Sequence, residues 1–234
     1  METDIVPDLL ENIKKDFNKN IRQSSRLKKV LEMIKKGNAS YSDANDYAIE
    51  LGELLAKSFN RFLTAEALPD GRMYYNIAER ILNDTLSNNH ALISTATSEI
   101  QEKLNIKSGF QIKGIKPTLK QDKIDGLINR VASEEAFEEV KWILDEPIVN
   151  FSQSIVDDAI KENAEFHSKS GLYPTITRTV DGANACQWCK AISGVFKYPD
   201  VPDDVYRRHD RCRCTVEYDP SDSKRQNIWT KEWR

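Results

Sequence analysis

The residues with the clearest chemistry lie in the last fifth of the chain. Cys186 and Cys189 form a C-x-x-C pair, and His209, Cys212 and Cys214 follow after nineteen intervening residues. A C-x-x-C knuckle turns two sulfurs toward one point, and thiolates with an imidazole nitrogen suit a tetrahedral Zn2+ with bonds of ~2.0–2.3 Å. All four cysteines of the chain belong to this cluster. The spacing therefore predicts one structural zinc site, with five candidate ligands for four positions and the fourth ligand left open.

Two other states of these cysteines compete with zinc: a pair of disulfides, and reduced thiols that bind nothing. His209 within the cluster favours the metal, and so does the need of a small β module for a cross-link. A thioredoxin-like redox role is disfavoured because no parallel strand is expected before Cys186. The sequence has no open catalytic zinc pattern, P-loop, G-x-S-x-G, H-E-x-x-H or Gly-rich dinucleotide turn. We therefore expect a protein that is not an enzyme.

The composition is that of a hydrated, helical chain. The 234 residues include 34 Lys+Arg and 37 Asp+Glu, which gives a net charge of -3 and no overall basic signature. Charged residues make up 30% and hydrophobic residues 39% of the chain, a balance that favours long helices with solvated faces. No apolar run approaches the ~18 residues of a membrane span, and the first residues lack the apolar stretch of a signal peptide. We expect a soluble protein with no membrane partner.

Apolar residues recur at three- and four-residue intervals and predict a helical body over residues 1–170. Helical stretches are expected over 9–34, 41–63, 74–104, 117–131 and 133–160, with a linker over 107–116. Lys36-Gly37-Asn38 predicts a stop, and Ser42 or Asp43 is expected to cap the next helix. A break is considered at residues 87–89, and prolines at positions 117 and 147 are expected to open helices.

The composition changes after Gly171, where β-branched residues become frequent. Strands are expected over 175–180, 193–198 and 213–218, with a loop over 199–204. These strands and the cysteine cluster together predict a C-terminal module over residues 171–234. The predicted fold class is mainly α, with a small C-terminal zinc-stapled α+β module.

The residues of this module carry a resemblance to a known family. The C-x-x-C pair is followed by Ile192-Ser193-Gly194-x-Phe196 and then by Val205-Tyr206-Arg207-Arg208-His209-Asp210-Arg211-Cys212-Arg213-Cys214-Thr215-Val216. This pattern resembles the C-terminal motif of the minor head proteins of tailed bacteriophages, the Mu protein F-like family. Members of that family place a C-x-x-C … G-x-x-[FY] … H-x-x-C-R-C module behind a variable helical region. The likeness covers residues 172–220, and more loosely the tail over 224–229.

The resemblance implies a virion structural protein in the capsid interior, assembled in the cytoplasm of a host bacterium. Family members associate with the portal protein and the packaged double-stranded DNA, and they take part in head morphogenesis. Some leave with the genome at ejection. Two other classes compete: an enzyme on an ADP-ribosyltransferase-like scaffold, to which the family's module has been likened, and a zinc-containing DNA-binding regulator. The first lacks an ordered Arg, Ser-x-Ser and Glu-x-Glu series, and the second lacks a helix after the second ligand pair.

Local basic patches are the candidates for contact with DNA. Residues 19–36 carry seven basic side chains against Glu32 alone, with Lys28 and Lys29 at their centre. The arginines around the cysteine cluster form a second candidate patch: Arg207, Arg208, Arg211 and Arg213. Guanidinium groups bind phosphate well. The competing interpretations are a solvated helix face for the first patch and, for the second, neutralisation by nearby aspartates: Asp200, Asp203, Asp204 and Asp210.

The remaining tryptophans and histidines are interpreted as structural. Trp188, Trp229 and Trp233 are expected to pack within the module, and Trp142 is expected in the helical core. Two histidines lie outside the cluster. His90 is expected in an exposed loop or cap, and His167 is expected near a helix C-terminus, where a cation suits the helix dipole.

Overall fold

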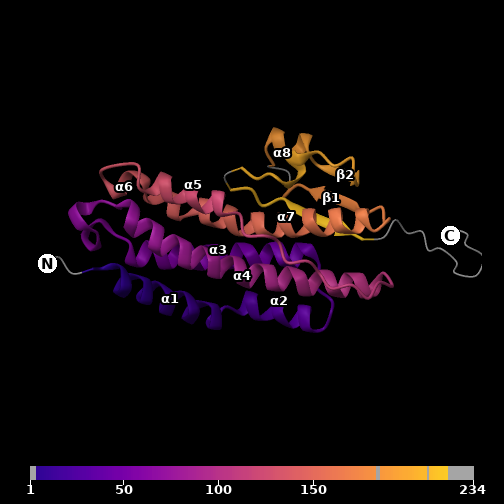
Figure 1. Cartoon of the computed structure of the whole chain (residues 1–234), viewed down its shortest axis with the longest axis horizontal. Coiled ribbons are helices and arrows are strands. Elements are labelled where there is room, and N and C mark those ends of the chain that lie inside the picture. Colours follow the sequence, from indigo (N-terminus) through magenta and orange to yellow (C-terminus); the bar gives the residue numbers. More distant parts are fainter. Residues whose placement is uncertain (1–3, 183–184, 210, 221–234) are drawn as a thin grey trace, which may run out of the picture.

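The computed structural model describes residues 4–182, 185–209 and 211–220. It shows an elongated helical bundle with a small sheet and a short helix lying along one side (Figure 1). The described elements, in chain order, are α1 (Val6–Gln23), α2 (Ser25–Lys35), α3 (Tyr41–Phe62), η1 (Ala65–Ala67), η2 (Pro69–Gly71), α4 (Tyr75–Lys107), α5 (Gln121–Val131), α6 (Phe137–Val140), η3 (Lys141–Leu144), α7 (Glu146–Lys169), β1 (Thr175–Thr179), α8 (Gln187–Ala191), β2 (Gly194–Lys197), η4 (Asp203–Tyr206) and β3 (Thr215–Asp219). The prediction of a mainly helical chain with a small C-terminal sheet is confirmed.

Serine caps divide the first helices. The side chain of Ser24 accepts a hydrogen bond from the backbone N–H of Leu27, so the apolar period expected over 9–34 is split into α1 and α2. The predicted stop is confirmed, because α2 ends before Gly37, which adopts a φ of 71°. The cap of α3 is Ser40 rather than Ser42 or Asp43. Ser40 and Asp43 exchange hydrogen bonds in a capping box, which satisfies two backbone N–H groups of the first turn.

Helix α4 runs without the break considered at residues 87–89. Asn89 is fully buried inside α4 and donates to the hydroxyl of Ser152 on α7 at 2.7 Å. A polar residue with a partner on a facing helix does not interrupt the backbone ladder, and this keeps α4 continuous. The helix expected from Pro117 begins later, at Gln121, while the helix expected at Pro147 is confirmed with that proline in the first turn of α7.

The core of the bundle lies between α3 and α7. Gly52 of α3 faces α7 so closely that an added Cβ would lie 2.8 Å from the Cα of Val149. The absence of a side chain at position 52 therefore lets the two backbones approach. A buried hydrogen bond of 3.1 Å from Gln153 to Asn45 joins the same two helices and fixes their relative position.

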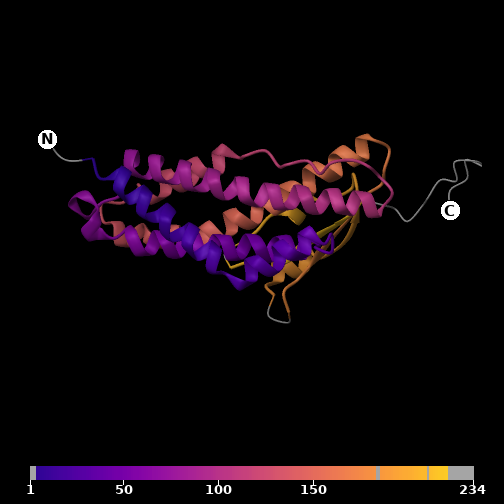
Figure 2. The same ribbon diagram turned by 90° about the horizontal axis from the view of Figure 1, so that it is seen from below.

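The three expected strands form one antiparallel sheet in the order β2-β1-β3. Strand β3 contacts both α3 and α7. Ile176, Val205, Val216 and Tyr218 are buried in the same apolar core as the helices. The sheet and the helical body therefore share one core across residue 170, and Figures 1 and 2 show the sheet lying along α7.

A buried ion pair also joins the module to the body. Arg208 donates to both carboxylate oxygens of Asp157 on α7, at 2.5 and 2.8 Å, and to the carbonyl of Cys214 at 2.8 Å. The exposed fraction is 3% for the Arg208 side chain and 1% for that of Asp157. One guanidinium thus links the middle of α7 to the segment that carries the cysteines.

Three aromatic or histidine expectations are corrected. Trp142 lies in η3 with 51% of its surface exposed, because the inward positions of that turn are taken by Ile143 and Leu144. His90 lies inside α4 and not in a loop. His167 is on α7 as expected, but it is fully buried and hydrogen-bonded to the hydroxyl of Tyr218. Burial lowers the pKa of His167, which favours a neutral ring over the expected cation.

We predict that Asp157→Asn destabilises the fold strongly. The substitution leaves the guanidinium of Arg208 buried without a counter-charge, a change that costs about 3–5 kcal/mol. The matched control is Asp204→Asn, which breaks the exposed Arg207–Asp204 pair and is expected to cost less than about 1 kcal/mol. Urea denaturation followed by circular dichroism measures both changes. Equal losses in the two variants would contradict the prediction.

Candidate metal centre

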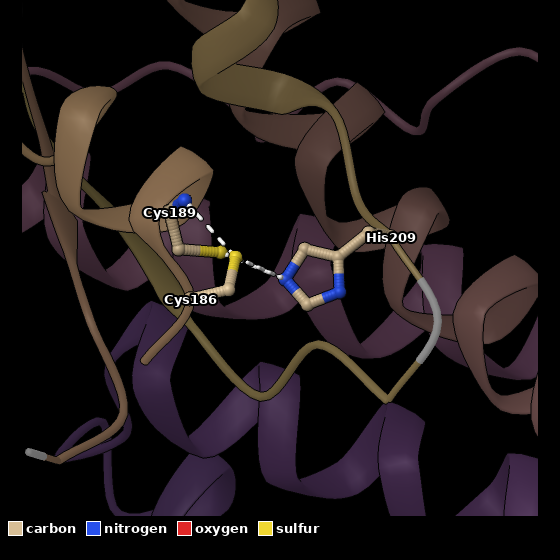
Figure 3. A group of neighbouring side chains, drawn as sticks. All are labelled: Cys186, Cys189 and His209. Atoms are coloured by element: carbon tan, nitrogen blue, oxygen red, sulfur yellow. Dashed lines mark hydrogen bonds between the residues drawn. The ribbon is translucent and has the colours of Figure 1, made fainter. Parts of the chain in front are cut away.

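The first two donors are positioned by the short helix α8. Cys186 is the N-cap residue, and its sulfur accepts a hydrogen bond from the backbone N–H of Cys189 at 3.3 Å. One turn of helix therefore brings the two sulfurs of the C-x-x-C pair to the same side, as the spacing predicts. Cys186 is exposed, whereas Cys189 is buried. Figure 3 shows both side chains turned toward the ring of His209.

The other three donors come from the chain between η4 and β3. The backbone N–H of Cys212 donates to the carbonyl of His209 at 3.1 Å, which closes a tight turn. Arg211 within this turn has a φ of 56°. After the turn, Cys212 and Cys214 are both buried in a small cluster with Cys189. Both precede β3, which begins at Thr215, so Cys214 lies just outside the strand that was expected over 213–218.

The donor atoms form two groups that share Cys189. In one group the Nε2 atom of His209 lies 3.3 Å from the sulfur of Cys186 and 3.0 Å from that of Cys189. In the other, the sulfurs of Cys189, Cys212 and Cys214 lie within 4.8 Å of one another. The distance between the sulfurs of Cys189 and Cys212 is 3.8 Å. The structure thus brings together all five predicted ligands: Cys186, Cys189, His209, Cys212 and Cys214.

These distances are close to the edges of a metal tetrahedron. Two sulfurs each ~2.3 Å from a tetrahedral ion lie ~3.8 Å apart, and a sulfur and a nitrogen at ~2.3 and ~2.0 Å lie ~3.5 Å apart. The sulfurs of Cys189 and Cys212 match the first value, and the two contacts of His209 fall slightly below the second. The side chains present are therefore able to hold a metal ion after small shifts.

The thiols experience different electrostatic environments. The backbone N–H of Cys189 stabilises the Cys186 thiolate and lowers its pKa. Burial raises the pKa of Cys189 to about 12. A bound cation reverses the effect of burial, because a metal ligand must be deprotonated and the ion stabilises the thiolate. Cys214 differs from Cys189: burial disfavours its thiolate too, but hydrogen bonds from the Asp181 backbone and from Cys189 and Cys212 outweigh burial and lower its pKa.

Arg178 is a component of the site that the sequence reasoning missed. It lies on β1 with 1% of its surface exposed, and its Nη2 atom lies 3.7 Å from the sulfur of Cys212 and 3.9 Å from that of Cys189. Its guanidinium also lies over the ring of Trp188, 5.7 Å from the centroid. The available signal was strand alternation, which places Arg178 on the buried face of β1 together with Ile176.

The arginines expected to contact DNA do not form one patch. Arg208 is buried against Asp157 and has no exposed face for a phosphate. Arg213 pairs with Glu146 on α7 at 2.6 Å, and Arg207 pairs with Asp204 at 3.0 Å, which confirms local neutralisation for Arg207. Arg211 is exposed. Asp210, Trp229, Trp233 and the 224–229 tail lie outside the described residues.

The basic stretch on α1 and α2 has a different character. Lys28 and Lys29 are exposed on α2, and among the described residues neither lies within ion-pair distance of a carboxylate. Lys19, Arg22, Lys35 and Lys36 are likewise exposed. Arg26 is the exception, because it pairs with Glu50 at 3.0 Å. In Figure 1 these two helices lie along the edge of the bundle opposite α8.

Comparisons of the chain with protein-family models, with curated proteins and with solved structures found no match. In the part of the chain that the structure describes, no helix combines the length and the apolar character that crossing a membrane requires.

We predict that Cys189→Ser abolishes metal binding. Cys189 belongs to both donor groups, so its loss leaves neither group with three ligand atoms. Elemental analysis of the purified wild-type chain should give about one metal ion per chain, and the variant should give almost none. The control is Gln187→Ser on the same short helix, which removes no donor and should leave the metal content unchanged. Retention of metal by Cys189→Ser would refute the site.

Proposed function

We propose that this chain is a minor head protein of tailed bacteriophages, of the Mu protein F-like kind, and that its C-terminal module holds a structural Zn2+. The observation that carries the proposal is that the motif's five donors lie in two adjoining groups that share Cys189. In this proposal the protein lies in the capsid interior, associates with the portal protein and the packaged DNA, and acts in head morphogenesis. A role in genome ejection follows from the same likeness.

Zinc is the metal that this donor set favours. Thiolates and an imidazole are soft or borderline ligands, and their number and separations fit a four-coordinate site. Three of the four sulfurs are buried, and the Trp188 ring covers His209 edge-on with a centroid separation of 5.8 Å. These features support a structural role, in which the ion cross-links α8 to the segment before β3.

The local structure argues against the rival regulator. The segment after Cys214 is strand β3, which contacts α3 and α7. A zinc-containing DNA-binding regulator normally places a helix after its second ligand pair, and that helix enters the major groove. No observation on the described residues favours the ADP-ribosyltransferase-like alternative. We therefore assign the module to assembly and to no catalytic step.

Contact with packaged DNA is assigned to the basic edge formed by Lys19, Arg22, Lys28, Lys29, Lys35 and Lys36. These side chains are exposed and lie on α1 and α2 or directly after α2. The net charge of -3 repels DNA on average, so binding depends on this local edge. Such contacts are made to phosphates and carry no base selectivity. Arg208 has no part in this contact, because Asp157 holds it in the interior.

We predict that the chain is a virion component that binds the portal protein encoded in the same genome. Mass spectrometry of purified particles should detect it at low copy number, and it should co-purify with the co-expressed portal protein. A matched co-expression with the major capsid protein alone is the control. Absence from intact particles together with no portal binding would overturn the proposed function.

We predict weak, salt-sensitive binding to double-stranded DNA through Lys28 and Lys29. Each phosphate contact contributes ~0.9 to the slope of log affinity against log salt, so Lys28→Glu/Lys29→Glu should reduce that slope by about 2 and weaken binding at low salt. The control is Lys161→Glu/Lys169→Glu, which changes the net charge equally at two lysines that already pair with acids. Gel shifts at rising salt give both quantities. If the wild type binds no DNA at low salt, the contact with the genome is wrong and the portal role stands alone.

A further inference from the structure

Arg178 presents an electrostatic problem that the protein atoms alone do not solve. A guanidinium is always charged in proteins, and burial of an unpaired charge is costly. The Nη1 atom of Arg178 donates to the carbonyl of Val205 at 2.5 Å, and its Nε atom has no hydrogen-bond partner among the described residues. Within the described chain no carboxylate lies within ion-pair distance of Arg178.

The charge balance of the buried region shows an excess of one positive charge. Arg178, Arg208 and Asp157 are all buried, and the carboxylate of Asp157 is held on both oxygens by Arg208. The groups that remain for Arg178 are cysteine sulfurs: those of Cys189 and Cys212 lie 3.9 and 3.7 Å from its Nη2 atom, and its charge also favours the thiolate of Cys214. Neutral thiols would leave the excess uncompensated. A dication with three thiolates and one neutral imidazole carries a net charge of minus one, which balances it.

We infer that Arg178 is the counter-charge of the metal site, and that the ligands are Cys186, Cys189, Cys212 and His209. This inference rests on the proposed zinc site and adds the identity of its ligands and a residue that stabilises them. Three separations among these donors are near tetrahedral size: 3.3 Å from Cys186 to His209, 3.0 Å from His209 to Cys189, and 3.8 Å from Cys189 to Cys212. Cys212 belongs to the second donor group, with Cys189 and Cys214, so in this proposal it shifts toward His209 when the ion binds. Four thiolates would give a net charge of minus two and leave the region negative.

Cys214 then has a separate role. The contacts of Arg178 at 3.7 and 3.9 Å select Cys212 and Cys189 as the sulfurs nearest to its charge. The carbonyl of Cys214 accepts from Arg208. The sulfur of Cys214 lies in one group with those of Cys189 and Cys212 and hydrogen-bonds with them, so in this proposal it is the fifth donor, which supports the ligand sulfurs and does not bind the ion.

The test measures the zinc affinity of the full chain by competition with a chromophoric chelator. Arg178→Met and Arg178→Gln remove the charge and should weaken zinc binding by about 10–100-fold, which is the usual effect of losing a group that supports metal ligands. Arg178→Lys keeps the charge and should stay within about threefold of the wild type. Arg207→Met is the control, because Arg207 is exposed and pairs with Asp204. Far-UV circular dichroism checks that each variant is folded. If Arg178→Met does not fold, the comparison of Arg178→Gln with Arg178→Lys decides the outcome.

The ligand assignment is tested in the same assay with Cys212→Ser and Cys214→Ser. The first should lose zinc binding, and the second should retain it. Equal affinity for the Lys, Gln and Met variants would overturn the role of the charge, and so would a Met variant that binds better than the Lys variant. Loss of zinc in Cys214→Ser with retention in Cys212→Ser would overturn the ligand set. A wild-type chain that binds no zinc would instead refute the site proposed above, whereas these other outcomes leave that site in place.

Discussion

The ion pair between Asp157 and Arg208 is the contact on which the arrangement of the C-terminal module depends. It fixes the chain segment before β3 to the middle of α7, and the hydrogen bond of Arg208 to the carbonyl of Cys214 holds the cysteine segment at the same place. A buried pair of this kind contributes little net stability, but it strongly disfavours any arrangement in which either charge is left alone. The module can therefore dock on the helices in few ways. The shared apolar core, with Val216 and Tyr218 against the helices, supplies the stabilising free energy.

The sequence was informative where the signal is local. Apolar periodicity located the helices, β-branched residues located the strands, and the spacing of Cys186, Cys189, His209, Cys212 and Cys214 located the donor cluster. Each helix or strand pattern spans at most a few turns, and the donor pattern consists of two short segments, 186–189 and 209–214. The boundaries were less accurate because caps depend on single hydrogen bonds, as at Ser24 and Ser40.

Long-range partners could not be predicted in the same way. Asp157 and Arg208 are 51 residues apart, and Arg178 meets Cys212 across 34 residues. The sequence contains several acidic and basic residues that could form ion pairs equally well. Only the packing of α7 against β3 determines which of them pair. For this reason the arginines near the cysteines were expected to meet nearby aspartates or DNA, whereas Arg208 and Arg213 instead meet carboxylates on α7.

Two ion pairs that join the C-terminal module to the helical body have their arginines in the module and their acids on α7. This division limits how the module can be exchanged between proteins. A graft that carries residues 171–220 onto another helical body takes Arg208 and Arg213 with it but leaves behind their acidic partners, Asp157 and Glu146. Such a chimera would bury a guanidinium against a surface that was never matched to it. Recombination that preserves function must therefore transfer the whole of α7 together with the cysteine segment, or select compensating acids at the positions of Asp157 and Glu146. The segment that must be transferred as one piece is therefore larger than the cysteine motif, because it includes the helix that carries the acidic partners.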